Sequence, residues 1–231
     1  MGMGYVQMVL QKKNPFLTHE EQDAATMLTD IHSVASIREN EIRLVGKKSI
    51  MIPALNFYGV YTSSPNNRFR IAWCDGLGRG NGLYVLIKGD DIICQGSMAR
   101  AHDGKVADNG TFILNDWCSS EILMGVFYAF NENGVELLRV NYAANLFSNG
   151  ISEDGRFAAC QTCSSNDEQD SAVLSIFDLV NGKELCRFRA ESGWPTTIEF
   201  SANGEFVVLG YQNDARKFKY MLDGKFFDRN F

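Results

Sequence analysis

The chain has 231 residues, of which 45% are hydrophobic, and a formal net charge of −6 at pH 7. A chain of this length can bury one sizeable core, and all-β folds of this size often form a single domain. The acidic balance does not fit a general nucleic-acid binder, whose surface must attract phosphates. No run reaches the roughly 18 apolar residues of a membrane-spanning helix. We therefore expect neither a nucleic-acid partner nor a membrane partner.

Residues 18 to 35 are predicted to form an amphipathic helix. Thr18 and Glu21 have the spacing of a capping box, with Thr18 as the N-cap. The apolar residues that follow fall on one helix face: Ala24, Met27, Leu28, Ile31 and Val34. This face either docks on the protein's own body or binds a partner, and both interpretations stay open.

The N-terminal sequence and the six cysteines bear on the compartment. The first eight residues are too short and too weakly basic for a signal peptide. Without an export signal, the six cysteines are interpreted as reduced thiols in a reducing compartment. We therefore expect a cytoplasmic protein.

One pattern recurs four times: a short apolar strand, a polar turn, and a phenylalanine that opens a second strand. The four phenylalanines are Phe69, Phe112, Phe157 and Phe206, and their spacings are 43, 45 and 49 residues. Asn-Gly and Asp-Gly pairs in these turns supply the positive φ angles that tight hairpins need. The pattern therefore predicts four similar hairpins.

A second hairpin follows each of the first four. Its turns contain Gly89, Gly134, Gly182 and Gly224, which are 45, 48 and 42 residues apart. Each unit therefore has two hairpins, or four strands that we name A to D. Strand B is nearly all apolar, as in Phe206–Leu209, which is typical of a strand covered on both faces. Units of this length that stack on one another would bury both faces of each sheet.

The third unit carries a resemblance to a known family. It combines Ser152-Glu153-Asp154-Gly155-Arg156-Phe157 with a later strand that ends in Phe177-Asp178 and the turn Asn181-Gly182-Lys183. These motifs resemble the WD-repeat and related β-propeller families, although the Gly-His and Trp-Asp signatures are missing and Phe177 replaces the Trp. The resemblance implies an all-β fold: a β-propeller, or an arc of one, with about four to five four-stranded blades. It would occupy residues 41–231, after an N-terminal segment of residues 1–40.

The number of blades is open at the N-terminal end. Residues 41–52 predict a further hairpin around Gly46, which lies 43 residues before Gly89 and so matches the C–D turn of a preceding blade. No matching A–B pair follows at the C-terminus. Three arrangements would resolve this: the hairpin pairs with residues 1–16, the helix replaces the missing strands, or another chain completes an open arc. An open arc leaves unpaired strand edges, which proteins usually cover.

Several motifs that suggest chemistry fit better as structure. Cys160 and Cys163 form a C-x-x-C within strand B, without the further ligands that zinc needs. The glycine-rich segment 75–82 joins two strands instead of leading into a helix, so it is predicted to be a loop. The acidic segment 166–170 lacks the calcium-loop pattern and is predicted to be a solvated loop. We expect no metal, no cofactor and no catalytic residue.

The functional prediction is a non-enzymatic propeller that binds a protein partner or a second copy. One rim comprises the B–C and D–A connections, and Trp and Arg dominate binding hot spots. The candidate partner-binding residues are Arg79, Arg100, His102, Trp117, Trp194 and Arg216. Trp117 as a core residue and Trp194 as a loop brace are the structural alternatives.

Two other functions stay open. The first is a subunit of a larger assembly whose neighbour covers the open edge of this chain. The second is a propeller-type hydrolase or a small-molecule-binding enzyme with a site in the central channel. In that case, His102 with Asp103 in a D–A connection, or Asp116 at the end of a B strand, are the groups to inspect.

Overall fold

The computed structural model describes residues 41–76, 81–118, 121–212 and 214–230. Within them the fold is all-β, and the helical content is a single 3-10 turn, η1 (Pro53–Leu55). The described part of the chain contains no helix that is long and apolar enough to cross a membrane. The predicted helix over residues 18 to 35 lies outside the described residues, as does the rest of the segment 1–40.

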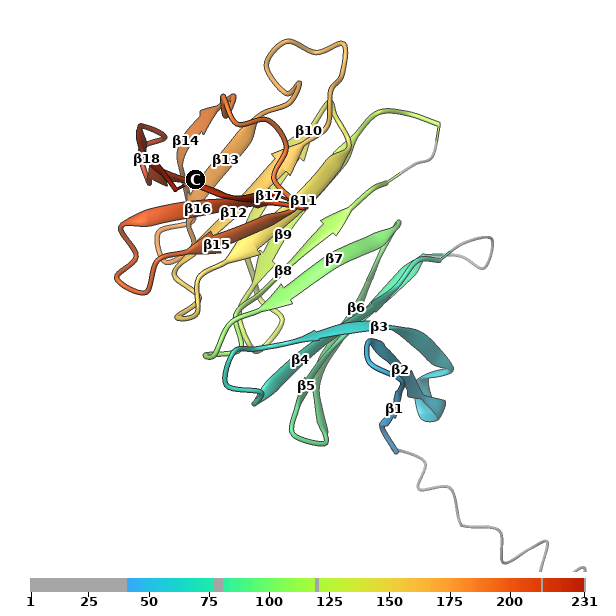
Figure 1. The fold of residues 1–231 in the computed structure, drawn as a ribbon. Helices are drawn as coiled ribbons and strands as arrows, with labels where there is room; N and C mark the ends of the chain where they lie inside the picture. The colour runs from blue at the N-terminus through green and yellow to red at the C-terminus, as the bar shows by residue number, and fades with distance from the viewer. Residues whose placement is uncertain (1–40, 77–80, 119–120, 213, 231) are drawn as a thin grey trace, which may run out of the picture. The chain divides into compact units, whose positions relative to one another are not determined.

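The strands form four antiparallel sheets, and each sheet is made of consecutive strands paired in chain order (Figure 1). Sheet 1 contains β1 (Arg43–Val45), β2 (Ser49–Ile52), β3 (Phe57–Ser63), β4 (Phe69–Cys74), β5 (Gly82–Lys88) and β6 (Asp91–Met98). Sheet 2 contains β7 (Ala101–Val106), β8 (Phe112–Asp116), β9 (Gly125–Phe130) and β10 (Glu136–Tyr142). Sheet 3 contains β11 (Leu146–Ile151), β12 (Phe157–Thr162), β13 (Leu174–Asp178) and β14 (Lys183–Phe188). Sheet 4 contains β15 (Thr197–Phe200), β16 (Phe206–Tyr211), β17 (Asp214–Met221) and β18 (Phe226–Asn230).

The two predicted sets of hairpins are confirmed. Each of the four phenylalanines is the first residue of the second strand in its hairpin. The four glycines of the second hairpins all have positive φ, between 59° and 83°, a region that other residues enter at a cost.

Three of the first hairpins close through the same side-chain hydrogen bonds. In sheet 3, the backbone N–H of Phe157 donates to Ser152 Oγ at 2.9 Å, and that hydroxyl donates to Asp154 Oδ1 at 2.6 Å. The backbone N–H of Arg156 also donates to Asp154 Oδ1, at 3.0 Å. The same bonds recur at Ser64, Asn66 and Phe69 and at Ser201, Asn203 and Phe206. The serine thus satisfies the N–H of the first strand residue after the turn.

The first hairpin of sheet 2 differs from the other three, and it has Ala107 in place of the serine. Ala107 N–H donates to the Thr111 carbonyl at 2.8 Å, whereas Ser152 N–H reaches one residue further, to the Phe157 carbonyl. A shift of one residue turns every following side chain to the other face of the sheet. Phe112 therefore points toward sheet 1, where its ring lies 5.8 Å from that of Tyr84. The repeat placed Phe112 correctly along the chain, but its side chain does not point as that of Phe157 does.

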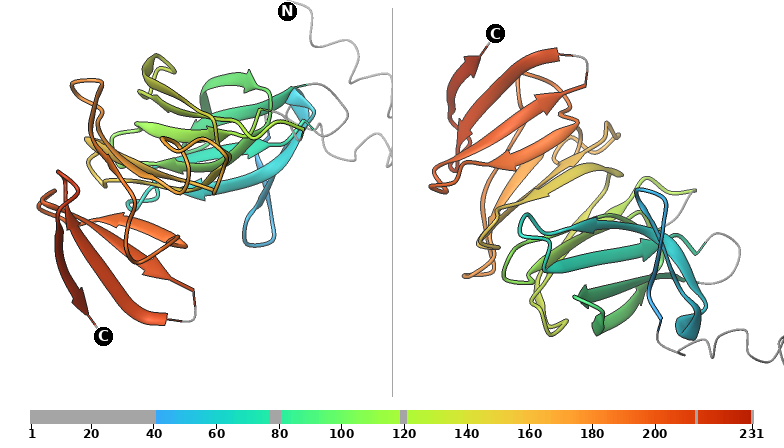
Figure 2. Two further views of the ribbon diagram at one scale, coloured as in Figure 1. Left: turned by 90° about the horizontal axis from the view of Figure 1, so that it is seen from above. Right: turned by 60° about the horizontal axis from the view of Figure 1, so that its bottom comes forward.

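Each sheet packs face to face with the next one in the chain (Figure 2). Buried clusters lie between sheets 1 and 2, between sheets 2 and 3, and between sheets 3 and 4. Strands β8 and β12 are buried along their whole length, as expected for strands that are covered on both faces.

The N-terminal hairpin does not belong to a preceding sheet, and this prediction is wrong. Strand β2 pairs directly with β3, with Ile52 opposite Phe57, across the η1 turn. Ile50 and Ile52 are fully buried and lie in the cluster on the free face of sheet 1. The other members of this cluster include Phe57, Ala72, Val85 and Ile87. The hairpin thus covers the apolar face that a preceding sheet would have covered.

The serine bonds predict a specific loss of stability. Replacing Ser152 with Ala leaves the backbone N–H of Phe157 without its acceptor, so we expect the free energy of unfolding to fall by about 1 kcal/mol. The opposite change, Ala107→Ser, should cause no such loss. Chemical denaturation of both variants tests this, and an equal loss in the two would contradict the role of the hydroxyl.

The covering hairpin predicts unequal costs for two facing residues. Ile50 is fully buried, whereas its cross-strand partner Leu44 is 49% exposed. We expect Ile50→Ala to lower the free energy of unfolding by about 3 kcal/mol, and Leu44→Ala by less than about 0.5 kcal/mol. Urea denaturation measures both values. Similar small losses would mean that the hairpin does not cover the core.

Candidate functional site

The first strands of the four-stranded repeats, β3, β7, β11 and β15, lie side by side (Figure 1). Thr62 Oγ1 donates to the Gly104 carbonyl at 2.7 Å, which joins β3 to β7. Next to Gly150 in β11, β15 approaches so closely that an added Cβ would lie 2.1 Å from the Ile198 carbonyl oxygen. These strands and their flanking residues line a hollow of about 500 Å³, which we call the inner groove.

A polar network forms the floor of the inner groove between β7 and β11. Strand β7 has a bulge between His102 and Lys105, and Asp103 within it has a φ of 45°. The bulge turns Asp103 toward β11, where its carboxylate accepts from Asn149 N–H at 3.1 Å and its carbonyl accepts from Asn149 Nδ2 at 2.6 Å. Lys105 pairs with the same carboxylate. Asp103 is therefore engaged in joining two sheets.

Three of the predicted binding residues contact one another, and one of them, His102, lines the groove. The Arg100 guanidinium lies 5.6 Å from the centre of the Trp117 ring, and the His102 ring stacks on Trp117 at 3.8 Å with an angle of 21°. Arg100 also pairs with Asp75 at 2.9 Å, and this hydrogen-bonded carboxylate raises the pKa of the guanidinium. Trp117 Nε1 donates to the Leu146 carbonyl at 2.9 Å, so the half-buried indole braces β11. We name Arg100, His102 and Trp117 the stacked cluster.

The three residues considered for catalysis, His102, Asp103 and Asp116, lie in strands of sheet 2. His102 and Asp103 lie inside β7, not in a D–A connection, so the sequence placed them wrongly. Asp116 is buried, and its carboxylate accepts from the backbone N–H groups of Ala99, Arg100 and Cys118. It holds the turn between sheets 1 and 2.

An exposed aromatic pair stands beside the groove. Phe147 lines the groove, and its ring lies 5.5 Å from that of Trp194. Phe147 is 38% exposed and Trp194 is 41% exposed. Trp194 was predicted from its residue type, but Phe147 was not. No sequence pattern marks Phe147, because Leu146 beside it is also apolar and yet is buried.

The remaining predicted residues do not join this site. Arg79 lies outside the described residues. Arg216 is exposed and lines a second hollow, of about 360 Å³, on sheet 4 with Tyr211 and Phe218. The six predicted residues therefore do not form one surface.

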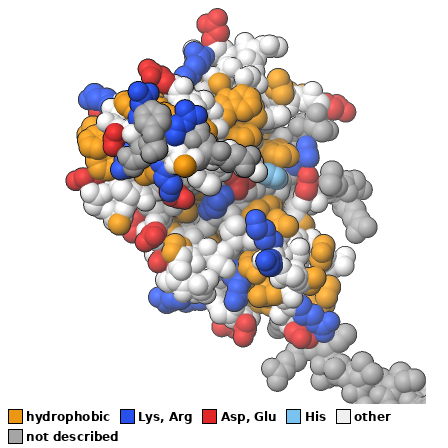
Figure 3. Space-filling view, viewed as in Figure 1, with side chains coloured by type: hydrophobic (Ala, Val, Ile, Leu, Met, Phe, Trp, Pro, Cys, Tyr) orange, Lys and Arg blue, Asp and Glu red, His pale blue; other side chains and the backbone are white. Residues whose placement is uncertain are grey.

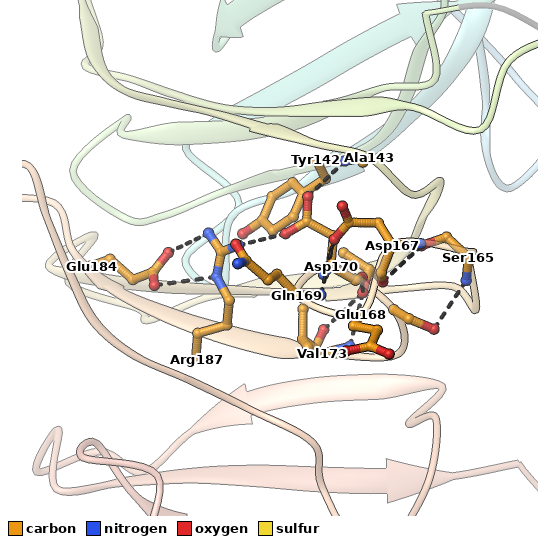
Figure 4. Close-up of polar contacts among 12 residues, drawn as sticks. Tyr142, Ala143, Ser165, Asp167, Glu168, Gln169, Asp170, Val173, Glu184 and Arg187 are labelled. Atoms are coloured by element: carbon orange, nitrogen blue, oxygen red, sulfur yellow. Dashed lines mark hydrogen bonds and ion pairs between the residues drawn. The ribbon is translucent and has the colours of Figure 1, made fainter.

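The acidic loop 166–170 is held in place by its own carboxylates (Figure 4). Asp170 accepts from Ala143 N–H at 2.7 Å and pairs with Arg187 at 2.6 Å. Arg187 also pairs with Glu184 and lies 4.8 Å from the centre of the Tyr142 ring. The prediction of a solvated loop is therefore wrong for Asp170, whose side chain joins the loop to β14.

The C-x-x-C motif fits a structural role. Cys160 is fully buried, its thiol donates to the Tyr142 hydroxyl at 3.3 Å, and burial raises its pKa to about 12. A thiol with that pKa is protonated at neutral pH and is a poor nucleophile. Across the described residues, no group of three His, Cys, Asp or Glu side chains is arranged to hold a metal ion.

Comparisons with known proteins add no family. No protein-family model matches this chain, and no curated protein matches it in sequence. The geometry of the inner groove and of the stacked cluster therefore carries the functional interpretation.

The stacked cluster predicts a pH effect through His102. Burial lowers the pKa of His102, and Lys105 and Arg100 act in the same direction, against Asp103 and Asp75. The unfolded chain, with a histidine pKa of about 6.5, then binds the proton more readily. Stability should therefore decrease as the pH falls through about 6.5. His102→Phe keeps a ring on Trp117 and should reduce this dependence in denaturation experiments. An NMR titration that places the pKa of His102 above that of a free histidine would contradict the assignment.

Proposed function

We propose that residues 41–231 form an open arc of a β-propeller and act as a protein-binding module. The four sheets would be its blades, and the N-terminal hairpin would be a cap rather than a fifth blade. Three features support this: consecutive four-stranded meanders, neighbouring first strands, and the serine-closed turns that resemble WD-like repeats.

The observation that carries the binding function is the exposed pair Phe147 and Trp194 beside the inner groove. Exposed aromatic side chains that lie next to each other are typical apolar anchors of a binding surface. Other hydrophobic side chains are exposed between charged ones on the face in Figure 3. The pair differs from these because it borders a hollow of a size that can accept side chains from a partner.

The charges of the groove favour a peptide segment with a basic side chain. Asp103 and Lys105 neutralise each other, which leaves the carboxylates of Glu153 and Glu199 along the lining. Glu199 has an exposed contact of 3.4 Å with Lys217, and exposed pairs of this kind bind weakly. A partner that places an apolar side chain on Phe147 and a cation near these carboxylates would fit both features.

The same geometry weighs against hydrolysis in the groove. A general base must be within reach of a substrate proton, but the Asp103 carboxylate is held by Lys105 and Asn149. The proposed setting is the cytoplasm, because all six cysteines are free thiols, which fits a reducing compartment.

Affinity capture with matched variants tests the binding function. Wild-type chain, Phe147→Ser and Trp194→Ala would be used as baits in extracts of the native host, with Val180→Ser as the control. Val180 is also an exposed apolar residue, 74% exposed in the turn after β13, away from the groove. We expect a partner that the wild type and the control retain and that both groove variants lose by about tenfold or more.

Thermal denaturation of each bait separates lost binding from lost folding. If all four baits retain the same protein equally, Phe147 and Trp194 do not contribute to binding, and this part of the proposal is wrong. A wild type that captures no partner but turns over a small substrate would overturn the binding function itself.

A further inference from the structure

Sheet 4 has one covered face and one apolar face that no described element covers. Val207 and Leu209 in β16 are fully buried against sheet 3. Phe206 and Val208 alternate with them and point the other way, and the Phe227 ring lies 4.5 Å from that of Phe206. Phe227 is 55% exposed, and Met221, opposite Phe206, is 42% exposed. We call Phe206, Val208, Met221 and Phe227 the outer face of sheet 4.

The corresponding strands of the other sheets show what this face lacks. All residues of β8 and β12 are buried, because a sheet packs on each side of them. Strand β16 is similarly apolar, but only Val207, Leu209 and Gly210 in it are buried. Among the described residues, buried clusters lie behind sheet 1 and in the three spaces between sheets, and none lies on the outer face of sheet 4.

Sheet 1, at the opposite end of the stacked sheets, limits what can cover the outer face of sheet 4. The free face of sheet 1 is closed by its own hairpin through Ile50 and Ile52. A second copy therefore cannot receive sheet 4 on its sheet 1 without displacing that hairpin, and head-to-tail stacking has no open surface to use. Two copies that cover each other's outer face of sheet 4 would therefore meet through the same surface on each, in a two-fold arrangement.

The polar residues around the outer face suit such an arrangement. Lys217 and Lys219 lie in β17, and Glu199 and Asp228 lie in the edge strands β15 and β18, with Lys219 directly opposite Asp228. A two-fold pair brings identical patches together, so it requires both signs of charge on one patch.

We propose that the outer face of sheet 4 is a self-association surface that pairs two copies of this chain. This surface is distinct from the aromatic pair beside the inner groove, and the proposal does not rest on the binding function of that groove.

Adjacent phenylalanines in β18 provide a matched test. Phe227 belongs to the outer face, whereas Phe226 packs on Tyr220, on the side of sheet 4 that faces sheet 3. Their exposures are similar, 55% and 49%. Sedimentation equilibrium of the full chain over a micromolar concentration series should show a dimer. Phe227→Ser should raise its dissociation constant about tenfold or more, and Phe226→Ser should change it little.

A second variant separates a loss of dimerisation from misfolding of the serine variants. Met221→Lys puts a charge on an exposed outer-face position, so the chain should fold, as circular dichroism would show, but dimerise less. A wild type that stays monomeric over the whole series would overturn the proposal, whatever else then covers the face. A dimer that persists in both Phe227→Ser and Met221→Lys would overturn it as well.

Discussion

The structure depends on one constraint: a four-stranded antiparallel sheet with two apolar faces must have both of them covered. Sheets 2 and 3 meet this requirement through their neighbours, which is why β8 and β12 contain no exposed residue. The end sheets have only one neighbour each. Sheet 1 is completed by a hairpin of its own, and sheet 4 keeps an apolar outer face. The two ends therefore differ although the repeats between them are similar.

The hairpins could be predicted because their turns are local. A glycine with positive φ, or a serine that bonds the N–H five residues later, sets each turn without help from the rest of the chain. The strand or sheet that a hairpin packs against is not set by the sequence of the turn itself. The Gly46 turn has the spacing of the repeat, yet β2 pairs with β3, because the uncovered face of sheet 1 is what its isoleucines can bury. Likewise, the one-residue shift in the turn that contains Ala107 points Phe112 toward sheet 1, which spacing alone does not reveal.

The site was predictable in part for the same reason. Arg100, His102 and Trp117 were named for one rim, and they do meet, but as a stack that also braces β11. Phe147 was missed because it lies in a strand, where only the neighbouring sheet decides which alternate residue is exposed. The bulge that turns Asp103 toward Asn149 is a feature of backbone geometry that residue types do not reveal.

The two proposed surfaces arise from different parts of the same repeats. The inner groove is made by the first strand of each unit, so it exists only where several units stand side by side. The outer face needs sheet 4 alone, because it is the one described end without a cap. Glu199 borders both, since β15 is the first strand of its unit and part of the last sheet. A ring cannot close between sheets 4 and 1 while the hairpin occupies the free face of sheet 1. Any further sheet, from this chain or another, would therefore have to add at sheet 4.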